Sequence, residues 1–104
     1  MVTVVKSAED MKILIDCECL VVVDFFATWC GPCKAIAPKI EEMANGEFSD
    51  VKFLKVDIDE MEDLAVEYNI TAMPTFKFIK VGKEVDELVG ASVEKLKEKI
   101  NTHK

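Results

Sequence analysis

Two cysteines, Cys30 and Cys33, are separated by two residues in the string Trp29-Cys30-Gly31-Pro32-Cys33. On the first turn of a helix, residues at this spacing have Cβ atoms roughly 5–6 Å apart, close to the roughly 3.5–4.5 Å that a disulfide requires. A small adjustment of the backbone would therefore close or open the bond. The pattern predicts a reversible dithiol–disulfide pair.

The position of each sulfur predicts its role. Cys30 comes at the expected start of a helix, where free backbone N–H groups and the helix dipole favour a thiolate, so we expect it to be the attacking sulfur. Cys33 lies one turn inside and is shielded, which suits a thiol that resolves a mixed disulfide. Gly31 and Pro32 bring no imidazole or charge that would stabilise the Cys30 thiolate further, and this favours a more reducing couple. We therefore expect a reductant rather than an oxidant.

A second pair, Cys17 and Cys19, raises the alternative of a four-cysteine zinc site. The strand expected over residues 20–28 would separate the two pairs by roughly 30 Å at about 3.3 Å per residue, whereas zinc thiolates all lie about 2.3 Å from the metal. We therefore expect no metal site. Cys17 and Cys19 are interpreted most simply as small residues at the end of the first helix, with a regulatory thiol or an intermolecular disulfide as alternatives.

The apolar periodicity predicts the elements that position these residues. Residues 20–27 are apolar on both faces, which is typical of a central strand covered by helices on each side. Ser7, Asp59 and Ser92 are expected to cap helices, and Pro32 suits the first turn of another, which runs to about residue 44 and contains Pro38. Strands are expected over 3–5, 20–27, 51–58, 75–81 and 84–89. This order predicts one α/β domain over residues 1–104, with a mixed five-stranded sheet and four helices on both faces.

Composition excludes several classes of protein. Half of the 104 residues are hydrophobic, so the chain can bury a core without a disulfide framework. A net charge of −7 and the absence of Arg argue against nucleic-acid binding. The longest apolar run, residues 19–23, is far shorter than the roughly 20 residues of a membrane-spanning helix. The first residues lack the features of a secretory signal, so we expect a cytoplasmic protein.

Several stretches of the sequence match one known family: VVVDF at 21–25, ATWCGPCK at 27–34, Pro38, VDID at 56–59, MPTF at 73–76, Gly82 and Gly90-Ala91. With these stretches the sequence resembles the thioredoxin family over its whole length. The resemblance implies the thioredoxin fold and reversible reduction of protein disulfides by a monomer that holds no cofactor itself. Electrons would come from NADPH through a FAD-containing thioredoxin reductase, and the clients would be disulfide-containing proteins, for example of the peroxiredoxin type.

Asp24 interrupts an otherwise apolar strand. Either its face of the strand is wet, or the carboxyl is buried, which would be costly and would raise its pKa. The apolar neighbours on the same side, Val22 and Phe26, favour burial. The resemblance then implies that Asp24 is a proton acceptor beneath Cys33. Lys55, on the next strand, either offsets the buried charge or is simply an exposed side chain.

The resemblance also implies a substrate groove beside the cysteines. It implies that the Met73–Pro74 peptide is cis and faces the pair, so that the backbone of Met73 can bond to an extended peptide. Trp29 is either core packing or, next to an exposed thiol, the apolar rim of the groove, and we favour the rim. Met73 and the backbone of Gly90 and Ala91 would complete this groove. Asp59 would accept a hydrogen bond from the Trp29 indole, as the family implies, or would cap its helix.

Two other functions fit the same features. A disulfide oxidase or isomerase is disfavoured by the Gly31-Pro32 dipeptide and by the lack of a secretory signal. A partner-binding module, in which redox chemistry is incidental, would not form covalent links to its partners when Cys33 is replaced by Ser. His103 lies in a charged tail, and we assign no role to it.

Overall fold

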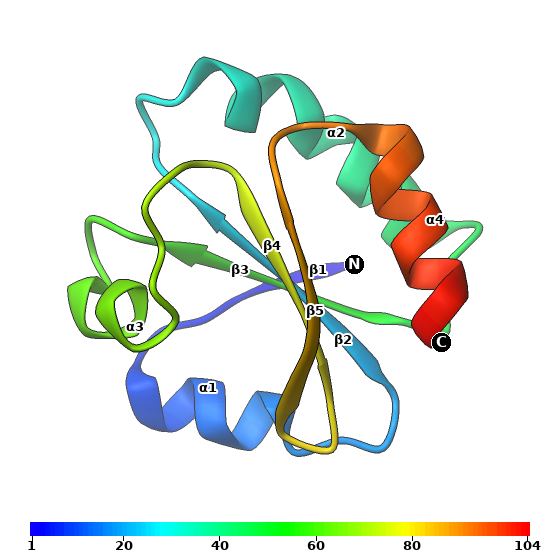
Figure 1. Ribbon diagram of the computed structural model, residues 1–104, viewed down its shortest axis with the longest axis horizontal. Helices are drawn as coiled ribbons and strands as arrows, with labels where there is room; N and C mark the ends of the chain where they lie inside the picture. Colours follow the sequence, from blue (N-terminus) through cyan, green and yellow to red (C-terminus); the bar gives the residue numbers. More distant parts are fainter.

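The structure is a computed structural model that describes residues 1–104 (Figure 1). The elements follow the predicted order, and no strand boundary differs from its predicted position by more than one residue. The strands are β1 (Val2–Val4), β2 (Leu20–Phe26), β3 (Lys52–Asp57), β4 (Thr75–Lys80) and β5 (Lys83–Val89). The helices are α1 (Ala8–Ile15), α2 (Gly31–Asn45), α3 (Glu62–Glu67) and α4 (Val93–His103).

The five strands form one sheet in the order β1-β3-β2-β4-β5, so β2 is the central strand. β2 pairs in parallel with β3 and antiparallel with β4, and β5 is antiparallel to β4. The predicted mixed sheet is therefore confirmed. Asp24, within β2, lies opposite Lys55 of β3.

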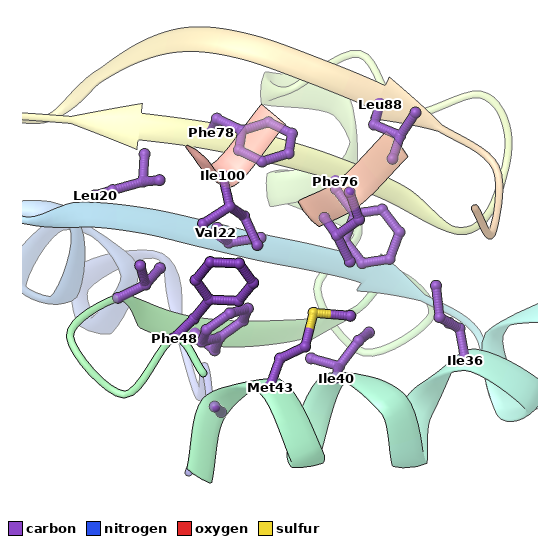
Figure 2. Close-up of a cluster of buried hydrophobic side chains, with 14 residues drawn as sticks. Leu20, Val22, Ile36, Ile40, Met43, Phe48, Phe76, Phe78, Leu88 and Ile100 are labelled. Atoms are coloured by element: carbon purple, nitrogen blue, oxygen red, sulfur yellow. The ribbon is translucent and has the colours of Figure 1, made fainter. Parts of the chain in front are cut away.

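Helices cover both faces of this sheet, as predicted: α1 and α3 lie on one side and α2 and α4 on the other (Figure 1). Alternate residues of β2 enter two separate cores, because successive side chains of a strand point to opposite faces. Figure 2 shows the core on the α2 side, where Ile36, Ile40 and Met43 point from the helix toward the strands. Burying each such side chain contributes about 1.5–3 kcal/mol. None of the helices is long and apolar enough to cross a membrane.

Two of the predicted helix caps are present and one is wrong. The Ser7 and Ser92 hydroxyls accept hydrogen bonds from the N–H groups three residues later, at 3.0 and 3.2 Å. Asp59 does not cap α3, because the chain first makes a turn in which the Met61 N–H donates to the Asp57 carbonyl at 2.9 Å. The cap residue of α3 is Met61, which makes no side-chain bond to the helix.

The turn between β4 and β5 consists of Val81 and Gly82, with φ angles of 52° and 74°. Positive φ at both central residues gives a turn whose twist matches that of the flanking strands. A β-branched residue pays about 1–2 kcal/mol for this conformation. The Val81 N–H donates to the Cys17 carbonyl at 3.0 Å, so this hydrogen bond ties the turn to the connection between α1 and β2.

His103 has contacts that its place in a charged tail did not suggest. Its Nε2 lies 2.9 Å from Asp86 Oδ2 on β5, and the Lys80 ammonium donates to its carbonyl at 2.9 Å. The interpretation of His103 as a residue without a role is wrong, because these bonds fasten the end of α4 to the sheet.

Candidate active site

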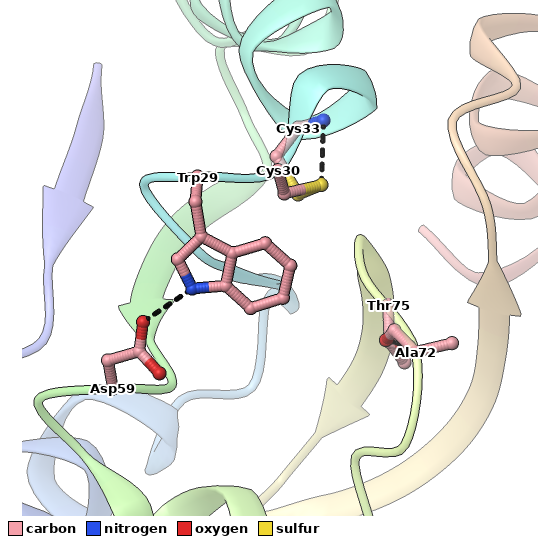
Figure 3. The surroundings of a disulfide bond; sticks show 6 residues. All are labelled: Trp29, Cys30, Cys33, Asp59, Ala72 and Thr75. Carbon is pink, nitrogen blue, oxygen red and sulfur yellow. Dashed lines mark hydrogen bonds between the residues drawn. A yellow bond between two sulfur atoms is a disulfide. The ribbon is translucent and has the colours of Figure 1, made fainter.

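The two cysteines of the first pair lie where β2 gives way to α2, and they form a disulfide. Cys30 is the cap residue of α2, and its Sγ accepts a hydrogen bond from the Cys33 N–H at 3.2 Å (Figure 3). Pro32 occupies the first turn, where a missing N–H costs nothing because that group has no partner in a helix. The helix terminus therefore presents an N–H group to the Cys30 sulfur, in the arrangement that favours a thiolate.

Both cysteines are shielded from solvent in this disulfide form. Cys30 is 6% exposed and Cys33 is 4% exposed. The expectation of an exposed Cys30 thiol is therefore wrong here, because Ala27, Phe26 and Met73 pack against the pair.

Asp24 is buried within β2, so the alternative of a wet strand face is wrong. Its residue is 6% exposed, and its Oδ1 atom has no hydrogen-bond partner. Burial raises the pKa of Asp24 to about 7, and the positive charge of Lys55 opposes that rise. The carboxyl is therefore a group that changes its charge close to neutral pH.

A cavity of about 280 Å³ joins this carboxyl to Cys33. Asp24, Lys55 and Cys33 all line it, so three predicted site residues from β2, β3 and α2 meet at one space. Lys55 is half-buried, and the interpretation of it as an exposed side chain is wrong. Ala37 also lines the cavity, and it was not predicted. Its position four residues after Cys33, on the same helix face, is a signal that would have found it.

A loop before β4 lies against the pair from another side. The Met73–Pro74 peptide is cis, and Met73 packs against the cysteine cluster. The Gly90 N–H donates to the Pro74 carbonyl at 2.9 Å, and the Thr75 hydroxyl donates to the Ala72 carbonyl at 2.6 Å. The first bond holds the loop before β4 to the end of β5, and the second closes the loop on itself.

Trp29 lies beside the disulfide with 65% of its surface exposed, so the core-packing alternative is wrong (Figure 3). Its indole N–H donates to Asp59 Oδ2 at 2.8 Å, which is the contact that the resemblance implied for Asp59. Ala91, next to Gly90, is also exposed. The structure thus brings an exposed aromatic side chain close to the cysteines and fixes its orientation through a carboxylate.

The second cysteine pair lies elsewhere. Cys17 and Cys19 follow α1, which ends at Ile15, and they form a disulfide with each other. They lie just beyond the end of α1 and pack, half-buried, against the core on that side of the sheet, which agrees with small residues at the end of the helix. The alternatives of a regulatory thiol and of an intermolecular disulfide stay predictions. No group of three or more His, Cys, Asp or Glu side chains is placed to hold a metal ion.

Comparison with known proteins gives one consistent result. The thioredoxin family model matches residues 1–102. Thioredoxin-1 of Schizosaccharomyces pombe is 47% identical over 103 residues, which cover 99% of each chain. Thioredoxin-2 of Pyricularia oryzae is 50% identical over 97 residues, but these are 93% of this chain and only 56% of that longer relative.

Solved structures agree with the sequence comparison. Thioredoxin of Fasciola hepatica superposes with a TM-score of 0.94 at 53% identity, over 98% of this chain and 99% of that one. A yeast chain, solved to explain how the glutathione and thioredoxin systems resolve the thiol of a mitochondrial 1-Cys peroxiredoxin, gives a TM-score of 0.91 at 36% identity, over 97% and 94%. The chain therefore belongs to the thioredoxin family and is a protein-disulfide reductase that works through the CxxC redox pair Cys30–Cys33.

Proposed function

We propose that Cys30 is the nucleophile of this reductase and that Cys33 is the resolving thiol. In the reduced protein, the Cys30 thiolate attacks one sulfur of a client disulfide, and the other client sulfur leaves as a thiolate. The Cys33 thiolate then attacks the Cys30 sulfur of the mixed disulfide and releases the second client thiolate. Two electrons pass to the client, and the Cys30–Cys33 disulfide forms.

The hydrogen bond at the start of α2 supports the role of Cys30. The Cys33 N–H lies 3.2 Å from the Cys30 Sγ, so it can stabilise a negative charge on that sulfur. Gly31 and Pro32 keep the turn short and add no charged side chain to it. Cys33 has no comparable position at the helix terminus and needs a base.

The observation that carries the proposal is the cavity shared by Asp24 and Cys33. A carboxyl whose pKa is raised to about 7 is partly ionised at neutral pH and can take the proton of the Cys33 thiol. Lys55, opposite Asp24, contributes by stabilising the ionised carboxylate. Asp24 is thus proposed as the proton acceptor that activates the resolving step.

The substrate groove is proposed to lie between Trp29 and the loop before β4. Pro74 orients the backbone of Met73, which would bond to an extended client peptide. The exposed Trp29 ring and the backbone of Gly90 and Ala91 would form the walls. Asp59 contributes by holding the Trp29 indole in place through its hydrogen bond.

The remaining parts of the cycle are proposed from the resemblance. Thioredoxins typically hold no cofactor. We propose that an NADPH-dependent thioredoxin reductase with FAD re-reduces the pair, in the cytoplasm, and that the chain acts as a monomer of one domain over residues 1–104. The yeast structure that concerns a peroxiredoxin makes proteins of that type the first clients to test.

A Cys33→Ser variant tests the proposed roles directly. Incubated with insulin as a disulfide-bonded client, it should form a mixed disulfide through Cys30 that non-reducing electrophoresis and mass spectrometry detect. A matched Cys30→Ser variant should form none. If Cys30→Ser traps the client and Cys33→Ser does not, the two roles are reversed. If neither does, the proposed function fails.

The reduction potential of the pair distinguishes the reductase from the oxidase or isomerase. It is measured by equilibration with glutathione buffers, followed by alkylation of free thiols. A value well below the cytosolic glutathione poise of roughly −220 to −260 mV agrees with the reductase. A value near the roughly −180 to −210 mV of the endoplasmic reticulum would favour the oxidase or isomerase and contradict the cytoplasmic location.

A further inference from the structure

The Cys17–Cys19 disulfide repeats one contact of the active site. The Cys19 N–H donates to the Cys17 Sγ at 3.2 Å, as the Cys33 N–H donates to the Cys30 Sγ at 3.2 Å. In each pair the backbone N–H of the second cysteine can therefore stabilise a negative charge on the first sulfur. Each first sulfur therefore has one backbone donor that would stabilise it as a leaving thiolate.

The two pairs lie at opposite ends of the central strand. Cys19 immediately precedes β2, and Cys30 follows it after a short connection. The seven residues of β2 span about 23 Å at about 3.3 Å per residue. Figure 1 shows the connection that leads into β2 and the one that leads to α2 at opposite edges of the molecule. Cys30 cannot reach the second pair of its own chain, so only another copy can bring a Cys30 to it.

The segment around the second disulfide is accessible. Cys17 and Cys19 are half-buried and Glu18 is exposed, whereas both cysteines of the active site are buried. The N–H and carbonyl of Glu18 take part in no backbone hydrogen bond. Free backbone groups beside an accessible disulfide are what an extended client must offer to a groove that binds through the backbone of Met73.

We propose that Cys17–Cys19 is a second redox couple, and that its disulfide is a client of the Cys30–Cys33 dithiol of a second copy of this chain. This inference rests on the proposed function of Cys30 and Cys33. The half-buried Cys17–Cys19 disulfide is more open to solvent than the buried Cys30–Cys33 disulfide, and a disulfide more open to solvent has the more oxidising potential. Electrons therefore pass from the buried pair of one copy to the accessible pair of the other.

The contact at Cys17 determines which sulfur is attacked. The Cys30 thiolate of one copy attacks the Cys19 Sγ of the other, and Cys17 leaves as a thiolate that the Cys19 N–H stabilises. Cys33 then gives its proton to Asp24 and attacks the Cys30 sulfur, and Cys19 leaves as a thiolate. Solvent supplies the protons that the two released thiolates take up. One copy ends with the Cys30–Cys33 disulfide and the other with two thiols.

A pair of matched variants tests this step. The trap carries Cys17→Ser, Cys19→Ser and Cys33→Ser, so that Cys30 is its only thiol. The target carries Cys30→Ser, Cys33→Ser and an affinity tag, so that only the Cys17–Cys19 disulfide remains. The two are mixed without oxygen, the free thiol is alkylated, and the purified target is mapped by tandem mass spectrometry. Insulin serves as the reference client, and a target with the further change Cys17→Ser, which has no disulfide to attack, is the control.

We expect a covalent heterodimer in which the trap is joined to Cys19 and the alkyl group is on Cys17. An alkyl group on Cys19 would overturn the assignment of Cys17 as the leaving sulfur. If the trap captures insulin but not the target, the second couple is not a client and the inference fails while the proposed function stands. If it captures neither, the proposed function fails and this inference with it.

The direction of electron flow is tested at equilibrium. A donor with Cys17→Ser and Cys19→Ser, fully reduced, is mixed with an equal amount of the oxidised target. We expect more than half of the target to become reduced, as counted by alkylation and mass. If half or less is reduced, the second pair is not the more oxidising one. Thermal unfolding of each variant by circular dichroism verifies that the proteins compared are folded.

Discussion

In each of the two disulfides, the first sulfur accepts a hydrogen bond from a backbone N–H at 3.2 Å, but the surroundings of the two disulfides differ. Cys30–Cys33 is shielded, borders a cavity with a buried carboxyl and lies beside an exposed tryptophan. Cys17–Cys19 is accessible, and its neighbours in sequence, Asp16 and Glu18, are exposed. With the roles proposed above, the difference teaches that a backbone donor to one sulfur is not enough for a reductase, because turnover would also need a base for the second thiol and a groove for the client.

The largest expected effect is a difference in the rate of insulin reduction between variants of the two cysteine pairs. Cys30→Ser should lower the rate of insulin reduction by more than about 1,000-fold, because the attacking sulfur is lost. The double variant Cys17→Ser/Cys19→Ser should change that rate by less than about 2-fold, because this pair lies at the far end of β2. The rate is measured by titration of the thiols released from insulin. A large loss in the double variant would break the comparison, since the second pair would then take part in client reduction.

The buried carboxyl of Asp24 should make the free energy of unfolding depend on pH, whereas an exposed carboxylate beside the second pair should not. Unfolded Asp24 releases its proton near pH 4, whereas the folded pKa is about 7. The free energy of unfolding should therefore fall as the pH rises from about 4 through 7, by up to about 4 kcal/mol. Asp24→Asn should remove this loss, so the variant should be the more stable protein at pH 8 by up to that amount.

Urea unfolding at pH 5 and pH 8 measures the difference. Asp16→Asn, which replaces an exposed carboxylate beside Cys17, is the matched control and should leave the stability within about 0.5 kcal/mol of the parent at both values. Equal pH dependence in the parent and in Asp24→Asn would show that the Asp24 carboxyl is not the group responsible.

Asp24 should also control the rate at which Cys33 resolves the mixed disulfide between Cys30 and the client. Asp24→Asn should slow the release of client from the mixed disulfide by about 10–100-fold near pH 7, while the first attack by Cys30 changes little. In the parent, the rate of release should rise with pH through about 7, because Asp24 must be ionised to accept the proton. Rapid mixing with a fluorescent client separates the two steps. An unchanged release rate would remove the role of Asp24.

The smallest effect concerns the second disulfide as a structural element. Its loop is so short that the entropy model gives a contribution of only about 1.6 kcal/mol to the free energy of unfolding. Cys17→Ser/Cys19→Ser should therefore lower the stability by no more than this, as measured by urea unfolding. The hydrogen bond between Val81 and the Cys17 carbonyl remains in this variant and holds the segment to the sheet. A much larger loss would identify the pair as a structural staple.

The sequence predicted the sheet, the layers and the first cysteine pair, because these follow from periodicity and from spacing within one helix turn. Features that depend on the path of the connections were harder to predict from the sequence. The bond between Trp29 and Asp59 and the cis peptide at Pro74 were expected only through the resemblance. The local pairing of Cys17 with Cys19 depends on how the connection after α1 bends, and the contact of His103 with Asp86 depends on where α4 ends. No period or propensity in the sequence encodes those features.

The unpartnered oxygen of Asp24 has a consequence for engineering this fold. Selection for heat resistance at neutral or alkaline pH should repeatedly yield substitutions at Asp24, because one substitution that removes this buried charge raises the free energy of unfolding. Such variants would stay folded on heating but would reduce their clients slowly. A screen for stable reductases should therefore measure client turnover as well as melting temperature. A screen on melting temperature alone will enrich variants that are more stable but less active.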